Sequence, residues 1–430
     1  MPATDLPPPP PDLRAAVAAG MTRALPGGPP DRLGVALSGG GDSVALSWAL
    51  ADWARAHGVA LSAVTVDHGL RPGSADEAAR AGVLAARLGL PHSVLHWEDG
   101  PPPGNLQALA RAARQRLIAA WTADCGIGHV ALGHTRDDQA ETVLLRLARG
   151  SGVEGLTAMR PARALGGVIW LRPLLDVGRA ELRIALRAAG LDWDDDPSNA
   201  DPRFDRVKAR AALAALAPLG IDAQVLADTA ARMAEAADAL ARAAHDLAGA
   251  ANLRVDAAGD VRLDRAVLAQ AAPDTRERLV GHLLGRLSGN PYRPRRAALR
   301  TALAAGLAGH AGTTVHGCVI AAEGSALRLG REWRAVRHLV TEPGAVWDRR
   351  WRLEAPGDTT GLHVAALGPQ GLAKCPGWPR TGLSRAGLMA APALWRGGDL
   401  VAAPLARPGD AGTATLLHDA RALGDGVLFH

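Results

Sequence analysis

The hydrophobic pattern between residues 33 and 189 alternates between two kinds of segment. Short runs rich in Val, Ala and Leu predict β-strands, and the longer runs beside them carry apolar residues at helical spacing. Strands joined by crossover helices form a mostly parallel sheet with helices on both faces, so the predicted fold class is α/β. The predicted strands are 33–38, 61–67, 92–97, 129–134 and 168–173, and the predicted helices are 43–57, 75–89, 105–124, 137–149 and 178–189.

The pattern changes after residue 217. A long alanine-rich stretch and two shorter amphipathic ones predict helices, and two further segments have the pattern of hairpins. Beyond residue 333, short apolar pairs among Trp, Gly and Pro predict a small β-rich module without a convincing helix. The predicted helices are 222–250, 277–287 and 295–307, and the predicted hairpins are 253–263 and 313–329.

These patterns divide the chain into four parts. A Pro-rich lead-in, predicted to be loosely held and to contain one short helix, precedes the α/β domain. A mainly helical middle domain and the C-terminal module follow it. The predicted bounds are 1–30, 31–216, 217–332 and 333–430.

Composition narrows the class of protein. The length of 430 residues suits two or three domains, and a net charge of +5 favours an anionic partner such as nucleic acid without requiring one. Cys125, Cys318 and Cys375 lie far apart, which argues against a disulfide scaffold, a zinc knuckle or a cysteine-held cluster. No apolar run approaches the roughly 20 residues of a membrane span, and no signal-peptide pattern is evident, so we expect a soluble, cytoplasmic protein.

The run Ser38-Gly39-Gly40-Gly41-Asp42-Ser43 lies between a predicted strand and a predicted helix. Its glycines let backbone N–H groups approach an anion, and the following helix directs its positive dipole end to the same place. The two serines add hydroxyl donors, and Asp42 offers an oxygen to a phosphate-bound cation. The run therefore predicts a pyrophosphate-binding loop.

The main alternative for this run is a tight glycine turn with a serine N-cap. The run is not a Walker loop, because that motif needs Gly-Lys-Ser/Thr and the chain's only lysines, Lys208 and Lys374, lie elsewhere. It does not match the Rossmann GxGxxG pattern either. The strand–turn–helix context favours phosphate binding.

Two further strand ends carry polar residues, Asp67-His68 and Gly133-His134. Ligands of parallel sheets bind at the carboxyl ends of strands, so we expect both pairs to lie beside the glycine-rich loop. A turn explains the first pair equally well, and a histidine such as His134 is more often structural than catalytic.

Asp138 and Glu141 lie three residues apart at the start of a predicted helix and share one of its faces. Their carboxylates suit Mg²⁺ ligation, an ammonium group, or simple complementarity to the helix dipole. The pattern leaves these three alternatives open.

Two arginine-rich segments lie farther along the chain. Arg206 and Arg210, one helical turn apart after the acidic run 194–196, suit a phosphate or an anionic intermediate. The arginines within 293–300, beside Tyr292, suit an RNA backbone. A solvated domain junction and a plain surface face are the respective alternatives.

Together these motifs resemble those of the tRNA(Ile)-lysidine synthetases, a family of the PP-loop ATP pyrophosphatase superfamily. The SGGxDS loop is shared across the superfamily, whereas the other motifs are specific and follow the family's order over residues 38–210. The matching segments are SGGGDS from Ser38, VDHGLR from Val66, GHTRDDQAET from Gly133, RGSGVEGLTAM from Arg149, RPLL from Arg172 and DDPSN from Asp195.

The resemblance implies a two-step ligase. ATP binds with Mg²⁺ at the loop, and the carbon-2 oxygen of the wobble cytidine in the CAU-anticodon isoleucine tRNA attacks the α-phosphate, releasing pyrophosphate. The ε-amine of free L-lysine then attacks carbon-2 and expels AMP, which gives lysidine. The resemblance also assigns tRNA docking to residues 217–332 and allows a homodimer.

The resemblance further implies roles for individual residues. Asp138 and Glu141 would hold the ammonium group of lysine, Arg206 would face the activated base or a tRNA phosphate, and Asp42 would lie near Mg²⁺; these four are the implied catalytic residues. The residues implied to line the nucleotide site are Ser38, Gly39, Gly40, Gly41, Asp42, Ser43, Val66, Asp67, His68, Arg71, Gly133 and His134.

The chain departs from the family pattern in two places. Family members often carry Arg-Asn where this chain has Arg206-Val207, and residues 333–430 do not match the C-terminal module of longer members, which leaves their role open. Three alternative functions remain. A PP-loop tRNA-thiolating enzyme would need paired cysteines, and a small-metabolite amide ligase would not need a basic middle domain. A non-catalytic nucleotide-binding RNA protein would tolerate loss of the two helix carboxylates.

Overall fold

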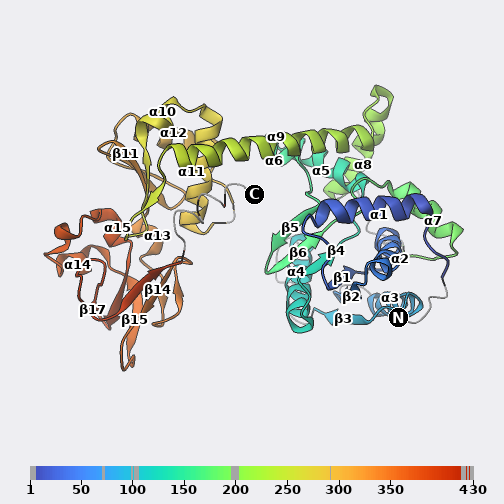
Figure 1. Ribbon diagram of the computed structural model, residues 1–430, viewed down its shortest axis with the longest axis horizontal. Coiled ribbons are helices and arrows are strands. Elements are labelled where there is room, and N and C mark those ends of the chain that lie inside the picture. The colour runs from blue at the N-terminus through green and yellow to red at the C-terminus, as the bar shows by residue number, and fades with distance from the viewer. Residues whose placement is uncertain are drawn as a thin grey trace. The chain divides into compact units, whose positions relative to one another are not determined.

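A computed structural model describes residues 6–69, 73–97, 100, 106–194, 203–290, 292–417, 423 and 426. The chain divides into two compact units, residues 1–237 and residues 238–430, and helix α9 (Ala223–Ala250) runs from the first into the second (Figure 1). Each unit has its own hydrophobic core.

The first unit is built on one sheet with the strand order β3-β2-β1-β4-β6-β5. All neighbouring strands are parallel except β5, which runs antiparallel to β6 at the edge. The predicted α/β class is therefore confirmed, and the edge strand β5 is an addition to it. The bounds are β1 (Arg32–Ala36), β2 (Ala60–Asp67), β3 (His92–His96), β4 (His129–Ala131), β5 (Ala162–Leu165) and β6 (Val168–Leu171).

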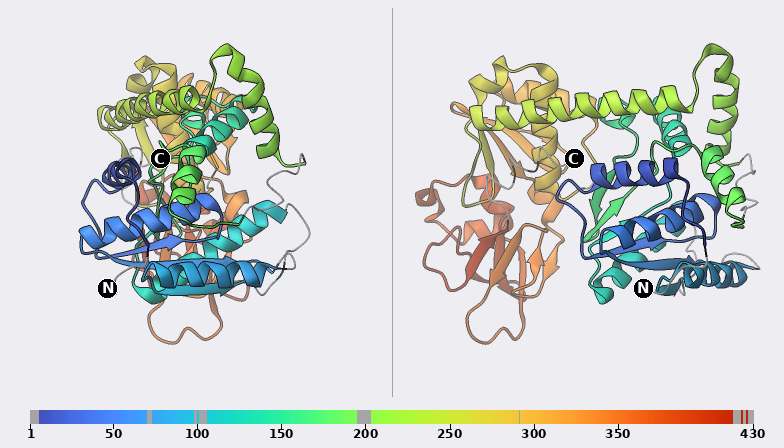
Figure 2. Two further views of the ribbon diagram at one scale, coloured as in Figure 1. Left: turned by 90° about the vertical axis from the view of Figure 1, so that its right-hand side faces the viewer. Right: turned by 45° about the vertical axis from the view of Figure 1, so that its right-hand side comes forward.

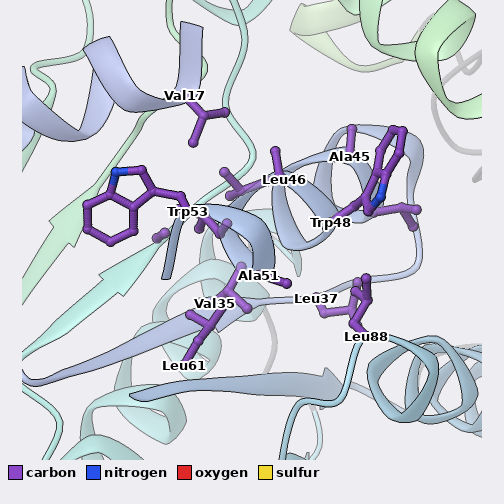
Figure 3. Packing of buried hydrophobic residues seen from close by; sticks show 14 of the residues in the cluster. Val17, Val35, Leu37, Ala45, Leu46, Trp48, Ala51, Trp53, Leu61 and Leu88 are labelled. Carbon is purple, nitrogen blue, oxygen red and sulfur yellow. The ribbon is translucent and has the colours of Figure 1, made fainter. Parts of the chain in front are cut away.

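Helices cover both faces of this sheet. On one face the fully buried side chains of Leu33 and Val35 in β1 belong to one core with Leu46 and Leu50 of α2. Figure 3 shows Val35 and Leu46 among these packed side chains. On the other face Trp121 of α4 belongs to a second core with the central strands. The helices of this unit are α2 (Gly41–Ala56), α3 (Ser74–Arg87), α4 (Leu106–Cys125), α5 (Arg136–Ala148), α6 (Val153–Leu156), α7 (Arg179–Ala188), α8 (Asp205–Leu216) and the short 3₁₀ helix η2 (Ala217–Leu219).

The N-terminal helix α1 (Pro11–Ala24) corrects the prediction of a loosely held lead-in. It lies against α2 (Figure 2). The side chains of Val17 and Met21 are buried in the main core. A Cβ on Gly20 would lie 2.0 Å from the carbonyl oxygen of Pro173. At this position the helix therefore lies too close to the backbone of Pro173 for any side chain. Apolar residues at helical spacing after a proline at the first helical position explain why this segment folds onto the domain.

The second unit contains an antiparallel sheet with the strand order β7-β8-β11-β10-β9. Helices α11 and α12 contribute Leu283 and Leu303 to the core that this sheet shares. The predicted helices and both predicted hairpins are present, but the hairpins join in one sheet. The bounds are β7 (Arg254–Val255), β8 (Val261–Asp264), α10 (Arg265–Gln270), α11 (Pro273–Ser288), α12 (Arg296–Leu307), β9 (Thr313–Val315), β10 (Cys318–Glu323) and β11 (Ala326–Arg331).

The last hundred residues are β-rich, as predicted, and form two small antiparallel sheets with the orders β12-β15-β16-β17 and β13-β14-β18. Trp347 and Trp351 are fully buried in their core, which explains the tryptophan-rich composition of this segment. Short helices also occur there, which the pattern did not predict. The bounds are α13 (Trp333–Val336), β12 (Val340–Thr341), β13 (Val346–Trp347), β14 (Trp351–Glu354), β15 (Leu362–Ala366), α14 (Gly368–Ala373), η3 (Trp378–Thr381), α15 (Arg385–Met389), β16 (Pro392–Arg396), β17 (Asp399–Ala402) and β18 (Thr413–Leu416).

Among the described helices, none is long and apolar enough by itself to cross a bilayer. Residues 205–219 and α9 meet that criterion only as a pair, and they are bent by 98° relative to each other.

Candidate active site

The glycine-rich loop connects β1 to α2, as the sequence predicts. Gly39 has a φ of +84°, a conformation that glycine adopts without strain. The Ser43 hydroxyl holds the bend together: it accepts from the backbone N–H and the hydroxyl of Ser38, both at 3.1 Å, and donates to the Gly40 carbonyl at 2.8 Å. Hydrogen bonds within the loop therefore fix the shape of the bend.

Helix α2 begins at Gly41, and its N-cap residue Gly40 has no side chain to accept from the first turn. Within the part of the chain that the structure describes, no acceptor takes the N–H groups of Gly39, Gly40 or Gly41. Unpaired N–H groups at a helix N-terminus form a ready site for a phosphate. The geometry therefore supports the predicted pyrophosphate loop.

The segment that leads to the predicted DDPSN motif packs onto this loop. The backbone N–H of Asp194 donates to the Gly39 carbonyl at 3.0 Å, and Arg80 of α3 pairs with the Asp194 carboxylate at 2.8 Å. The ring of Trp193 lies 3.4 Å from the place that a Cβ on Gly41 would take. Residues 195–199 themselves lie outside the described residues.

The end of β4 packs against the start of α2. A Cβ on Gly133 would lie 2.9 Å from the carbonyl carbon and oxygen of Asp42, so only glycine fits there. Close packing, independent of any ligand, is thus sufficient to explain this glycine.

Three helix N-termini meet beside the loop. Helix α5 contacts α7 through Asp137, whose carboxylate accepts from the backbone N–H of Arg179 at 2.7 Å. The side chain of Arg179 pairs in turn with Asp42 at the start of α2, with an Nε–Oδ2 distance of 3.1 Å. Helix dipoles directed at one point create a positive potential that favours anions.

Arg179 also reaches the two carboxylates predicted on α5. Its Nη2 lies 3.3 Å from Asp138 Oδ1, and its Nη1 lies 3.5 Å from Glu141 Oε1. The structure therefore brings Asp42, Asp138 and Glu141 together around one guanidinium. The first two belong to different helices and are 96 positions apart in the chain, which the sequence pattern alone does not connect.

The carboxylates differ in how well they are paired. Asp138 forms a capping box with Thr135 and accepts from its backbone N–H at 2.9 Å. Burial would raise the pKa of Asp138, but Arg179 and the Thr135 N–H outweigh it, so the pKa lies below its ordinary value. For Asp42, burial dominates over Arg179 and raises the pKa.

Glu141 is 2% exposed, and its Oε1 accepts from Arg210 Nε at 2.6 Å. Its Oε2 is buried without a hydrogen-bond partner among the described residues. A buried carboxylate oxygen without a donor is costly, so this position favours a ligand that carries one.

The arginines of α8 face this cluster. Arg206 Nη1 lies 3.6 Å from Asp138 Oδ1, and Arg210 pairs with Glu141. The two arginines therefore share one site with the carboxylates, and the role that the resemblance implies for Arg206 stays a prediction. Their partners are carboxylates, whereas the sequence pattern suggested a phosphate or an anionic intermediate.

His134, which follows β4, lies among arginines. Burial lowers its pKa to about 4; Asp138 opposes this shift, and Arg172 and Arg206 add to it. The imidazole is therefore neutral at pH 7, and its Nδ1 is buried without a partner among the described residues. Burial and nearby arginines also lower the pKa of Arg172, to about 10. Such a group of positive charges suits an anionic ligand.

The end of β2 is adjacent to the loop, because β2 pairs with β1. Asp67 accepts from the N–H of Gly69 at 2.9 Å, which is the main cause of its lowered pKa, so this carboxylate stabilises its own turn. His68 lies 3.3 Å from Arg114 through Nε2, and Val66 packs partly against the core under α4. Their predicted contacts with nucleotide stay predictions, and Arg71 lies outside the described residues.

The second predicted basic cluster, in the second unit, is partly neutralised. Glu277 of α11 accepts from Arg296 at 3.0 Å and from Arg300 at 2.8 Å. Both arginines remain more than half exposed, so they can still reach a phosphate, but they are not an unopposed basic face.

The cysteines argue further against the thiolation alternative. Cys318 and Cys375 are buried, no described cysteine pairs with another, and burial raises the pKa of Cys318 to about 11. A thiol with so high a pKa is a poor nucleophile at neutral pH.

Arg179 is the central residue that the sequence pattern missed. A cation at the first position of a helix is unfavourable because it meets the positive end of the dipole. The sequence Gly178-Arg179 at a predicted helix start could have drawn attention for that reason.

Comparisons with known proteins find relatives of this chain. Residues 15–217 match the family model described as the PP-loop domain. A tRNA(Ile)-lysidine synthase of Ruegeria pomeroyi is 48% identical, over 90% of this chain and 92% of that protein. A tRNA(Ile)-lysidine synthase of Brucella anthropi is 36% identical over 85% and 84%, respectively.

Among solved structures, the U34-tRNA thiolase NcsA of Methanococcus maripaludis aligns with a TM-score of 0.45. It shares 17% identity and covers 52% of this chain and 79% of its own, a likeness too weak to carry an argument. The relatives and the PP-loop match confirm the predicted family and its use of ATP. The chain belongs to the tRNA(Ile)-lysidine synthase family.

Proposed function

We propose that this protein ligates free lysine to carbon-2 of the wobble cytidine in the CAU-anticodon isoleucine tRNA, through an adenylated cytidine. The main support is the arrangement of two subsites side by side. A loop with unpaired N–H groups suits pyrophosphate, and Asp42 links it to the carboxylates of Asp138 and Glu141 through their shared arginine.

In the first step the carbon-2 oxygen of the cytidine bonds to the α-phosphorus of ATP, and the bond to the β-phosphate bridging oxygen breaks. Backbone N–H groups from Gly39 to Gly41 and the α2 dipole stabilise the charge on the departing pyrophosphate. Because the loop is pre-shaped by Ser43, little reorganisation is needed at that moment.

Asp42 fits the role of Mg²⁺ ligand. It is 23% exposed at the start of α2, and Mg²⁺ is commonly held by one or two carboxylates together with substrate phosphates. The described residues contain no cluster of three or more ligating side chains, so the phosphates themselves would complete such a site. When bound, the ion would neutralise phosphate charge.

Asp138 and Glu141 suit the ammonium group of lysine. The unpaired Oε2 of Glu141 supplies an acceptor in a buried, low-dielectric place where a charged partner is strongly favoured. In the second step the ε-amine, after losing a proton, bonds to carbon-2 and the bond to the AMP oxygen breaks. A neighbouring carboxylate can hold that proton.

Binding of tRNA completes the proposal. Arg206 and the arginines around His134 contribute positive potential beside the reaction centre, which suits the phosphates of the anticodon loop. We propose residues 31–216 as the catalytic domain and residues 217–332 as the domain that docks tRNA. We assign no role to the module at 333–430. A homodimer and a cytoplasmic location are both compatible with this scheme and belong to the proposal.

The direct test is incorporation of radiolabelled lysine into an isoleucine tRNA transcript with a CAU anticodon, in the presence of ATP. We expect label in precipitated RNA that depends on ATP and on the protein. A transcript with uridine at the wobble position serves as the matched control and should stay unlabelled. Equal labelling of both transcripts, or none of either, would contradict the proposal.

A further inference from the structure

One side chain, Arg179, occupies the centre of the proposed lysine site. Each of its three nitrogens faces a different carboxylate: Nε faces Asp42 at 3.1 Å, Nη2 faces Asp138 at 3.3 Å and Nη1 faces Glu141 at 3.5 Å. The guanidinium thus lies where the proposed function requires the ammonium group of the substrate.

These contacts are numerous but individually weak. All three are longer than the 2.7–2.9 Å typical of a charge-assisted hydrogen bond, whereas Arg210 approaches Glu141 to 2.6 Å. One guanidinium divided among three acceptors satisfies none of them fully. Burial alone would lower the pKa of Arg179, but Asp138 and Asp42 outweigh it and raise the pKa.

The backbone of Arg179 is anchored independently of its side chain. Its N–H donates to Asp137 at 2.7 Å, which fixes the start of α7. The side chain is 20% exposed and is held chiefly by charge, at a helix end whose dipole repels it. It can therefore leave the carboxylates without unfolding the helix.

We propose that Arg179 is a resident counter-ion that pairs with the three carboxylates when no lysine is bound and is displaced by the ammonium group of lysine. The exchange replaces one positive charge by another at Asp138 and Glu141, so these two carboxylates keep a cationic partner throughout. A compact ammonium with three donors is held at Asp138 and Glu141 more closely than the divided guanidinium. This inference rests on the proposed binding of lysine at those two residues.

Displacement has a measurable consequence. Lysine must compete with a cation that is already tethered beside the site, and its apparent affinity falls by the fraction of protein in which the site is open. Removal of the competing charge should therefore tighten lysine binding, even though it removes a positive group from the neighbourhood. A residue that merely supports the site would have the opposite effect.

The test is equilibrium dialysis of radiolabelled lysine against the full-length protein without ATP or tRNA, so that no turnover occurs. We expect Arg179→Gln to lower the lysine Kd about tenfold, and Arg179→Lys, which retains a charge, to stay close to wild type. Arg136→Gln is the matched control: Arg136 lies at the same junction and pairs with Glu181 and not with the three carboxylates. It should leave the Kd unchanged.

The outcomes separate this inference from the proposed function. Unchanged, weaker or undetectable lysine binding by Arg179→Gln, with a circular dichroism spectrum like wild type, would overturn the displacement. If Arg179→Gln is unfolded, lysine binding by Arg179→Met is judged by the same criterion. Failure of both variants to fold would also overturn the displacement, because the side chain would then be needed for the fold. Failure of the proposed lysine site shows differently: Glu141→Gln would bind lysine as well as wild type does.

Discussion

Two groups of charged side chains, one in each unit, both combine carboxylates with arginines and differ in how fully they are paired. In the second unit Asp348 accepts from Arg350 at 2.9 Å and from two nitrogens of Arg331, and all three side chains are almost fully buried. In the first unit Asp42, Asp138 and Glu141 share Arg179 at 3.1–3.5 Å, and one Glu141 oxygen has no partner among the described residues.

The difference separates a structural ion cluster from a binding one. Buried charges that hold a fold together need complete pairing, because an unpaired buried charge costs several kcal/mol. A site that must accept a charged ligand keeps some of its groups incompletely paired and partly accessible. Substitution in the fully paired cluster around Asp348 is therefore expected to lower stability. Substitution in the incompletely paired cluster around Arg179 is expected to lower activity.

The largest effect on stability is expected for Asp348→Ala. The change leaves Arg331 and Arg350 buried without their acceptor and should lower the free energy of unfolding by about 3–5 kcal/mol. Urea denaturation measures it. Asp399→Ala, which removes a partner of a surface pair with Lys374, is the control and should leave the midpoint unchanged. A wild-type midpoint for Asp348→Ala would remove the basis of the comparison.

Asp42→Asn should reduce pyrophosphate release by about 10³-fold, because it removes the charge beside the phosphate loop. The fold should keep its stability, since burial raises the pKa of Asp42 and its charge is not favoured there. Asp52→Asn serves as the control on the same helix, because Asp52 pairs with Arg14 away from the loop. Wild-type release of pyrophosphate by Asp42→Asn would disprove the assigned role.

Glu141→Gln should raise the KM for lysine by about 10²-fold, because it removes one charge of a buried pair. Pyrophosphate release should change little, since the first step does not use lysine. Glu181→Gln, an exposed carboxylate paired with Arg136, should behave as wild type. An effect confined to pyrophosphate release would show that Glu141 acts in the first step, and this would contradict its assignment to lysine binding.

A smaller effect on stability is expected from the protonation of His134 at acidic pH. Its pKa is about 4 in the folded protein and about 6.5 when unfolded, so between these values the unfolded chain binds a proton that the folded one does not. The free energy of unfolding should therefore fall as the pH drops from 6.5 towards 4, by about 1–3 kcal/mol. His134→Gln should remove this part of the slope; an unchanged slope would refute it.

The sequence predicts the α/β fold well because each strand is a short apolar run between amphipathic helices. It misses β5, whose four residues include Arg163 and lack any apolar run. It also underestimates α1, since a proline tract suggests looseness while the burial of Val17 and Met21 depends on helices elsewhere in the chain.

The candidate site is likewise only partly predictable from the sequence. Local motifs suffice for the loop at Ser38–Ser43 and for the shared face of Asp138 and Glu141, because each lies within one turn. Arg179 depends on contacts across 38 to 137 positions, which no local pattern encodes. The pairing of Arg296 and Arg300 with Glu277 is likewise a tertiary contact, so the cluster 293–300 looked more basic in sequence than it is.

The central claim is that the bend from Gly39 to Ser43 holds the phosphates that leave. A crystal structure of the protein with a non-hydrolysable ATP analogue tests it most directly. The account predicts β- and γ-phosphate oxygens within hydrogen-bond distance of the N–H groups of Gly40 and Gly41, with the α-phosphate directed towards His134. A triphosphate bound away from that bend would contradict it.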